Sequence, residues 1–186
     1  MVTGDSEYRP GNADDFHRLY HESYARTLKT VVAIVGDPAA AEDCTQDAFV
    51  RAFKAWHRWK PESAPEAWLQ RIAVRVAISH RRRERLRGIG ETIRRLGTPG
   101  HVRSHDDAVS NADALMAALR SLPPRQSAAV VLRYHHGYTS REIATALSVP
   151  ESTVASRLAK ARAALSTALE AQSTAASTLV VETESR

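Results

Sequence analysis

An all-α fold of two small helical domains joined by a flexible linker is what this sequence predicts. Apolar residues recur at steps of three and four along most of the chain, and no stretch alternates apolar and polar residues as a half-buried strand does. Over residues 88–110 this periodicity fades while glycine and proline become frequent. We therefore expect one domain over residues 12–87, a second over residues 111–170, and a disordered tail rich in Ser, Thr, Ala and Glu over residues 171–186.

The first domain begins with two helices whose limits are marked by turn residues. The first helix follows the apolar spacing from Phe16 to Val35, and Gly36 ends it. The second is expected over residues 39–59, because Asp37 precedes a proline in the manner of a helix N-cap and Pro61 stops the helix. Both patterns place one apolar face of each helix in a shared core.

The third helix and the residues that follow it carry the excess positive charge of the chain. The helix begins at a capping box, Ser63–Glu66, and runs into a basic segment. Residues 71–103 hold 10 basic and 2 acidic side chains, whereas residues 1–70 have a net charge of −3 and residues 104–186 a net charge of zero. So many cations without acidic partners favour a polyanion such as nucleic acid over a merely solvated face. The basic stripe on one face of this helix consists of Arg71, Arg75, Arg82 and Arg85.

The second domain ends in two helices that have the proportions of a helix-turn-helix. A capping box at Thr139–Glu142 starts a helix of two turns, and a second capping box at Ser148–Glu151 starts a longer amphipathic helix. A plain hairpin of a three-helix bundle is the alternative that this spacing leaves open. The outward residues of the longer helix are Ser152, Ala155, Ser156, Ala159 and Lys160, flanked by the phosphate-binding candidates Arg157 and Arg162.

The second helix carries a polar ridge and two tryptophans that could each bind a partner. The helix dipole explains acidic residues in the first turn, but Gln46 and Asp47 lie beyond that turn, so a protein-docking face is an alternative. Trp56 and Trp59 stand near a loop, where they would either stack on unpaired bases or belong to the core. The residues alone favour neither role.

Enzyme function is not expected. The paired His17 and His21 have no third ligand at a readable spacing, and the sequence has no glycine-rich phosphate loop and no nucleophile elbow. Hence no metal and no cofactor is expected. The single cysteine, Cys44, excludes an internal disulfide, and neither a leader peptide nor an apolar run long enough to span a membrane is evident. We expect a cytoplasmic protein without membrane insertion.

Several segments in a fixed order resemble the extracytoplasmic-function (ECF) sigma factors of the sigma-70 family. The resemblance covers about residues 12–170 and depends on the paired order of the segments rather than on any one of them. They are Phe16-His-Arg-Leu19-Tyr20, Ala41-Glu42-Asp43-Cys-Thr-Gln46-Asp-Ala-Phe49, Trp68-Leu69-Gln-Arg71-Ile72-Ala73, Leu122-Pro123, Glu142-Ile143-Ala144, and Ser152-Thr153-Val154-Ala-Ser156-Arg157-Leu158 with Ala161-Arg162.

The resemblance implies partners and roles. Sigma domain 2 (12–87) and sigma domain 4 (111–170) would together bind core RNA polymerase, at the β′ clamp helices and the β flap, and promoter DNA; an anti-sigma factor commonly restrains such proteins. For core binding the resemblance implies Asp43, Gln46, Asp47 and Arg51. For minus-10 recognition and melting it implies Trp59, Arg71, Arg75 and Arg82. For minus-35 reading in the major groove it implies Ser152, Ala155, Ser156, Arg157, Ala159, Lys160 and Arg162.

This chain departs from the usual pattern of the family at positions that read DNA. Val74-Arg75 stands where Arg-Asn is usual, and Ser79 stands where Asp is common, so a different minus-10 preference is expected. Ala155 occupies a position that is often basic, so minus-35 reading is expected to depend on Ser156 and Lys160.

Two other functions fit parts of the sequence. The chain would act as an autonomous helix-turn-helix repressor or activator if residues 1–87 served as a dimerisation or sensing domain. It would act as an RNA-binding or inhibitor-like adaptor if it used the basic stripe alone.

Overall fold

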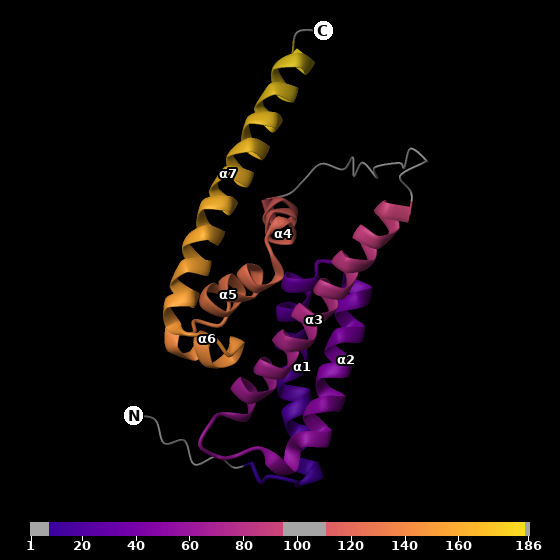
Figure 1. The fold of residues 1–186 in the computed structure, drawn as a ribbon, viewed down its shortest axis with the longest axis vertical. Helices are drawn as coiled ribbons and strands as arrows, with labels where there is room; N and C mark the ends of the chain where they lie inside the picture. The colour runs from indigo at the N-terminus through magenta and orange to yellow at the C-terminus, as the bar shows by residue number, and fades with distance from the viewer. Residues whose placement is uncertain (1–7, 95–110, 185–186) are drawn as a thin grey trace.

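The computed structural model describes residues 8–94 and 111–184, which form helices joined by short turns (Figure 1). The described residues contain no strand, so the predicted all-α fold is confirmed. The α-helices are α1 (Ala13–Val35), α2 (Pro38–Ala55), α3 (Pro65–Arg94), α4 (Asn111–Ser121), α5 (Pro124–Tyr134), α6 (Ser140–Leu147) and α7 (Glu151–Glu184), and a 3-10 turn, η1 (Trp56–Arg58), follows α2.

Helices α1, α2 and α3 pack on one another as a three-helix unit. The turn between α1 and α2 has the predicted chemistry. Gly36 adopts a left-handed φ of 88°, and its N–H bonds to the Val32 carbonyl at 2.8 Å. The Asp37 carboxylate then caps α2 by accepting a hydrogen bond of 2.7 Å from the Ala40 N–H. These local bonds satisfy backbone groups that the two helix ends would otherwise leave unpaired.

Helices α4 to α7 form the second unit, in which α7 packs on α4, α5 and α6. The capping box at the start of α6 is present in full: the Glu142 N–H bonds to Thr139 Oγ1, and the Glu142 carboxylate accepts the Thr139 N–H at 2.7 Å. The second predicted capping box is wrong. Ser148 ends α6 with a left-handed φ of 52°, which is not the extended conformation that an N-cap requires, and α7 begins at Glu151.

Helices α3 and α7 both extend beyond their predicted ends. Helix α3 continues to Arg94, so residues 88–94 of the predicted linker are helical, and residues 95–110 lie outside the described residues. A glycine inside a helix costs about 1 kcal/mol but does not remove backbone hydrogen bonds. Helix α7 continues to Glu184 through the segment predicted to be a disordered tail; this segment contains neither glycine nor proline, the two residues that most disfavour a helix.

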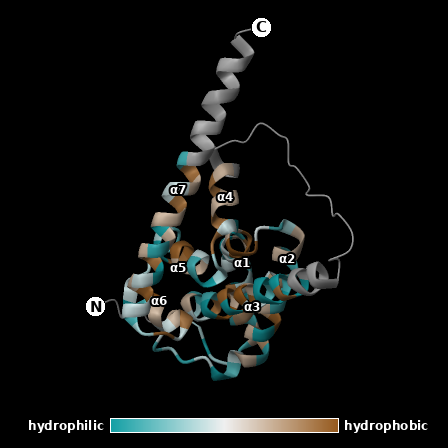
Figure 2. Ribbon diagram, turned by 45° about the horizontal axis from the view of Figure 1, so that its top comes forward, coloured by the Kyte–Doolittle hydropathy of each residue, from teal (hydrophilic) through white to brown (hydrophobic). Residues whose placement is uncertain are grey.

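The two units pack against each other, which the sequence did not predict. Helices α1 and α3 contact α4, α5 and α6. In Figure 2 the hydrophobic residues of α1, α3 and α5 gather where these helices meet. One apolar cluster is continuous across the contact, and its buried residues include Val31 and Ile34 from α1, Val74 and Ala77 from α3, Leu119 from α4, and Val131 and Leu132 from α5.

Candidate functional site

The outer face of α2 presents the polar residues that were predicted to bind core polymerase. Asp43, Gln46 and Arg51 are exposed, and Asp47 is half-buried. The Arg51 Nε lies 2.8 Å from Asp47 Oδ1, and this hydrogen bond raises the pKa of the Arg51 guanidinium. The ridge therefore carries an i, i+4 ion pair in the middle of the helix and acidic charge nearer its N-terminus.

Apolar side chains that the sequence analysis did not assign lie on the same helix and on α1 beside it. Val50 and Phe53 are 51% and 54% exposed, and Tyr20 of α1 is 37% exposed. The Phe53 ring meets the buried Phe16 ring edge to face at 5.2 Å. A patch with exposed apolar residues beside polar ones is typical of a protein interface. The spacing of Gln46, Val50 and Phe53, at i, i+4 and i+7, is the signal that could have revealed it.

Trp59 does not present a stacking surface for a DNA base in this conformation; of the two roles that the sequence left open, the structure shows burial in the core. Trp56 and Trp59 are each only 2% exposed and stack on each other, with ring centroids 4.9 Å apart. The Trp56 Nε1–H donates to the Asn12 carbonyl at 2.8 Å, and the Trp59 Nε1–H donates to the Ser63 carbonyl at 3.0 Å. Because both rings bury their faces and both N–H groups are bonded, the two tryptophans are core residues that shape the loop before α3.

The basic stripe of α3 lies partly in solvent and partly against the second unit. Arg82 is exposed and Arg71 is half-buried. The Arg75 Nη2 donates a hydrogen bond of 2.6 Å to Ser148 Oγ, in the turn of the helix-turn-helix. The two surfaces that were predicted separately to contact DNA are therefore in contact with each other.

The helix-turn-helix has the predicted packing. Ile143 and Val154 are fully buried, and Ala144 is 5% exposed, so α6 and α7 approach closely. Two hydrogen bonds from Thr139 hold the Glu142 carboxylate, and they lower its pKa below the usual range of a glutamate. The capping box thus determines the residue at which α6 begins.

The outward face of α7 carries short side chains and a few cations. The exposed residues are Ser152, Ala155, Ser156, Ala159, Lys160 and Arg162. Arg157 differs from these residues because its side chain is half-buried. Burial, together with the nearby charge of Arg125, lowers the pKa of Arg157. The Arg157 Nη1 is buried without a hydrogen-bond partner. Arg141, exposed in the first turn of α6, is a further cation of the helix-turn-helix that the sequence prediction did not include.

The described residues offer no arrangement for metal chemistry. No group of three or more His, Cys, Asp or Glu side chains among them is placed to hold a metal ion. His17 and His21 face each other across one helical turn, with their Nε2 atoms 3.0 Å apart. Within the same described ranges, no helix combines the length and the apolar composition needed to cross a membrane.

Comparison with known proteins assigns these two helical units to a family. Residues 19–87 match the family described as Sigma-70 region 2, and residues 112–165 match Sigma-70, region 4. The chain is 33% identical over 156 residues to the ECF RNA polymerase sigma factor SigL of Mycobacterium tuberculosis (strain H37Rv), covering 82% of this chain and 87% of SigL. The chain belongs to the ECF sigma factors of the sigma-70 family.

Other relatives agree with this assignment. The chain is 32% identical over 166 residues to the ECF RNA polymerase sigma factor SigE of Mycolicibacterium smegmatis, covering 87% of this chain and 62% of SigE. The fold is similar to that of sigma factor RpoE from Bartonella quintana, with a TM-score of 0.67 and 20% identity over 85% of this chain and 98% of RpoE. It is also similar to CnrH, with a TM-score of 0.61 and 24% identity over 87% of this chain and 91% of CnrH.

The predicted family and its function are thus confirmed. The region 2 match lies within α1, α2 and α3, and the region 4 match lies within α4 to α7. As an ECF sigma factor, the protein is a regulatory subunit that directs RNA polymerase in transcription initiation.

Proposed function

We propose that this sigma factor binds core RNA polymerase through the outer face of α2. The contact residues are Asp43, Gln46, Asp47 and Arg51, and the partner surface is the clamp helices of the β′ subunit. The exposed Val50 and Phe53 beside these residues support a protein partner, because nucleic acid does not select an acidic and apolar face. Domain 4, over residues 111–170, would engage the β flap.

The basic stripe of α3 is the surface we propose for the minus-10 element. Arg71, Arg75 and Arg82 would neutralise phosphates of the opened strand and hold it near the loop before α3. Trp59 is not part of this contact set while it is buried against Trp56, because it would reach a base only by leaving the core. Domain 2, over residues 12–87, would therefore act mainly through cations on α3.

The outward face of α7 is the surface we propose for the minus-35 element. Its exposed serines and alanines allow the helix to enter a major groove closely, and Lys160 and Arg162 supply positive charge for phosphates. Because Arg157 is half-buried with an unpartnered Nη1, it would reach a phosphate only after its side chain moves outward. Sequence reading then depends on Ser152, Ala155, Ser156 and Ala159.

We further propose that an anti-sigma factor restrains the protein in the cytoplasm. RpoE of Bartonella quintana is described in complex with the anti-sigma factor NepR, and CnrH in complex with the cytosolic domain of CnrY. In this proposal the sigma factor performs no catalysis of its own, since the polymerase supplies the chemistry, and it needs no cofactor.

The order of the two sigma-70 matches, with region 2 before region 4, is the observation that carries this proposal. The test is reconstitution of the full chain with core polymerase, followed by genome-wide mapping of transcript starts. Starts that share two upstream elements and require the sigma factor are expected. An absence of binding to core would overturn the proposal.

The two rival functions give different results in the same assay. Tight sequence-specific binding to duplex DNA by the free protein, without core polymerase, would identify an autonomous regulator. A footprint that ignores substitution of both Ser156 and Lys160 would identify an adaptor that uses only the basic stripe.

A further inference from the structure

A cleft of about 570 Å³ lies at the meeting point of several helix ends. The ends of α1 and α4, the starts of α2 and α5, and one face of α3 surround it. Pockets that bind small organic ligands in proteins have volumes of about 300–1,000 Å³. The cleft therefore has room for a ligand of the size of a nucleotide, and the side chains that line it determine which chemistry it accepts.

Three arginines line this cleft: Arg81 and Arg85 from α3, and Arg120 from the end of α4. Neither the proposed DNA contacts nor the proposed polymerase contacts use these side chains, and Arg85 is the one member of the basic stripe that lines the cleft. Arg81 and Arg85 are one helical turn apart, so their like charges repel each other. Burial, reinforced by the charge of Arg85, lowers the pKa of Arg81. Positive charge is thus concentrated along this cleft.

No carboxylate among the described residues lies within ion-pair distance of these three arginines. The Arg81 Nη2 donates instead to the carbonyls of Arg120 and Leu122, at 2.6 and 3.0 Å, where α4 ends. The Arg120 Nη1 donates to the Gly36 carbonyl at 3.2 Å, where α1 ends. These bonds use one nitrogen of each guanidinium, which has five N–H donors in all. Most of the donors, and the full positive charges, remain uncompensated.

Two of the arginines keep donors that no described residue accepts. The Arg81 Nη1 is buried without a hydrogen-bond partner. The exposed Arg85 guanidinium forms no hydrogen bond within the described ranges. A buried charged donor without an acceptor is costly, so a group that supplies both an acceptor and a negative charge would be bound favourably here. The missing complement of the cleft is an anion.

The two acidic residues of the cleft are engaged elsewhere. The Glu84 carboxylate accepts a hydrogen bond of 2.8 Å from Arg87 Nη1. The Asp37 carboxylate accepts the Ala40 N–H at 2.7 Å and caps α2. Because both carboxylates bind groups other than the three arginines, they leave the positive charge of the cleft in place.

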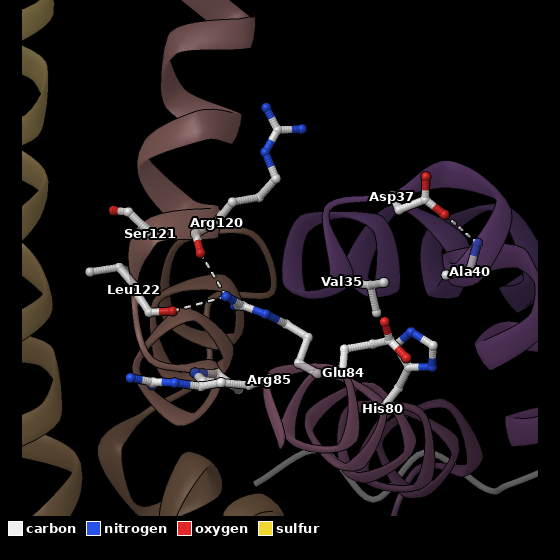
Figure 3. Close-up of a pocket in the computed structure, with 11 residues that line it drawn as sticks. Val35, Asp37, Ala40, His80, Glu84, Arg85, Arg120, Ser121 and Leu122 are labelled. Carbon is white, nitrogen blue, oxygen red and sulfur yellow. Dashed lines mark hydrogen bonds between the residues drawn. The ribbon is translucent and has the colours of Figure 1, made fainter. Parts of the chain in front are cut away.

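The cleft has different chemistry on its two sides. Figure 3 shows Arg85 and Arg120 on one side and Asp37 and His80 on the other. Arginine binds the oxygens of a phosphate group through two parallel N–H bonds. The opposite side offers a carboxylate and an imidazole, which suit the hydroxyl or amino groups of a ligand. Both sides together fit a molecule with a phosphate at one end and polar hydrogens at the other.

We propose that this cleft binds a small phosphorylated molecule, with its phosphate at Arg85 and at the remaining donors of Arg81 and Arg120. A nucleoside phosphate and inorganic pyrophosphate share this chemistry, and the experiment distinguishes them. The inference does not rest on the proposed function, because the ligand needs neither polymerase nor DNA in order to bind.

The first measurement is calorimetric titration of the full chain with inorganic pyrophosphate, adenosine diphosphate and guanosine diphosphate, at constant ionic strength. We expect one binding site per chain. Tighter binding of a nucleotide than of pyrophosphate would show that the side of Asp37 and His80 also contacts the ligand, whereas equal affinities would show recognition of the phosphates alone. The absence of binding of all three probes would overturn the proposal.

Arg85→Gln is the test variant, because it removes one cation of the cleft and no hydrogen bond of the fold. We expect it to weaken binding by about tenfold, the loss of one charge-assisted contact. The matched control is Arg83→Gln, since Arg83 is an exposed arginine of α3 that does not line the cleft. Arg83→Gln should bind like the unchanged protein. Equal loss in both variants would show that the probes bind the charged surface of α3 in general, and would overturn the proposal.

Arg85→Glu gives a second, independent test. It places a carboxylate one helical turn from Arg81, where the cleft has none, so it should raise the thermal unfolding midpoint of the protein without ligand. Pyrophosphate should raise the midpoint of the unchanged protein and leave that of Arg85→Glu unaltered. Circular dichroism checks that the helices are intact. An equal rise in both proteins would contradict a site in this cleft. Failure of the chain to bind core polymerase would refute the proposed function but not this one.

Discussion

At the scale of single residues, the structure distinguishes side chains that are available to partners from those that are committed to the fold. Asp47 keeps an accessible carboxylate on α2 although it pairs with Arg51. Trp59, by contrast, buries its ring in the first unit and donates its N–H to a carbonyl there. Helical spacing in the sequence is compatible with either exposure or burial of such a side chain. The reason is that spacing does not determine which residues near a helix end pack onto the core.

Reversing the charge of Asp47 should weaken core binding while leaving the fold intact. Asp47→Arg places two like charges at i and i+4 on the proposed docking face, so we expect at least a tenfold loss of affinity for core polymerase. The surface ion pair itself is worth no more than about 1 kcal/mol, so the free energy of unfolding should change little. A pull-down with core polymerase measures the effect.

Asp14→Arg is the matched control, because Asp14 is an exposed aspartate on α1 within the same unit. It should bind core normally. Unchanged core affinity in Asp47→Arg would remove the docking surface from the proposal.

His136 makes the contact between the units sensitive to acid. Its Nε2 lies 2.6 Å from Thr30 Oγ1, and the Thr30 hydroxyl donates its hydrogen to the Arg26 carbonyl, so the His136 Nε2–H is the donor. Burial, with the charges of Arg26 and His135, lowers the pKa of His136 from 6.5 to about 4. Between these values the unfolded chain binds more protons than the folded one. The contribution of His136 to stability is therefore complete above pH 6.5 and is lost as the pH falls toward 4.

We expect the free energy of unfolding to fall across this window, and His136→Gln to reduce the fall. Denaturant unfolding at several pH values measures it. Since carboxylates also titrate near pH 4, the comparison is made with His57→Gln, which removes an exposed histidine of the first unit. A pH profile for His136→Gln that matches the control would contradict the assignment.

At the scale of elements, the helix ends of the second unit determine how the helix-turn-helix is presented. Thr139 and Glu142 form a reciprocal cap at the start of α6, whereas Ser148 provides the left-handed turn before α7. Thr139→Ala should lower the free energy of unfolding by about 1 kcal/mol, because it removes the side-chain cap. Urea unfolding measures this loss.

Thr145→Ala serves as the comparison for the cap. Thr145 is an exposed threonine of the same helix, and its hydroxyl donates to the Arg141 carbonyl one turn earlier rather than capping the helix. A similar loss in both variants would show that threonine content, rather than capping, stabilises α6.

The stripe on α3 gives a prediction about promoter opening. Arg71→Ala or Arg75→Ala should weaken promoter opening more than core binding, since each removes a proposed phosphate contact from α3 and none from the face of α2. The salt dependence of promoter binding should fall by about one counterion for each arginine. Permanganate reactivity of the melted strand and a core pull-down separate the two effects, with Arg87→Ala as the control on the same helix. Equal loss in both assays would count against the stripe.

At the scale of the whole molecule, the two units behave as one packed body because a single apolar cluster crosses between them. A specific protease site inserted between residues 100 and 105 therefore allows a direct test. After cleavage, the two fragments should elute together from a size-exclusion column and separate only in denaturant. Fragments that elute separately at once would show that the apolar contact is too weak to hold the units together.

Much of this protein follows from its sequence alone. The turn at Gly36 and Asp37 and the capping box at Thr139 are local features, because each depends on residues close together in the chain. The all-α class follows from helical periodicity along the chain, and the family follows from the order of its segments. The positions of Asp43, Gln46 and Ser156 on exposed faces follow from helical periodicity for the same reason.

Only the tertiary structure decided the burial of Trp59, the left-handed turn at Ser148, and the contacts of Arg75, Arg81 and Arg120 across the two units. These features depend on which groups remain unpaired after each helix has formed. Helix ends with open carbonyls and apolar faces with no partner in their own unit are satisfied by segments distant in the chain. Sequence spacing identifies such groups but does not predict their partners, because the partners become neighbours only when the helices pack in three dimensions.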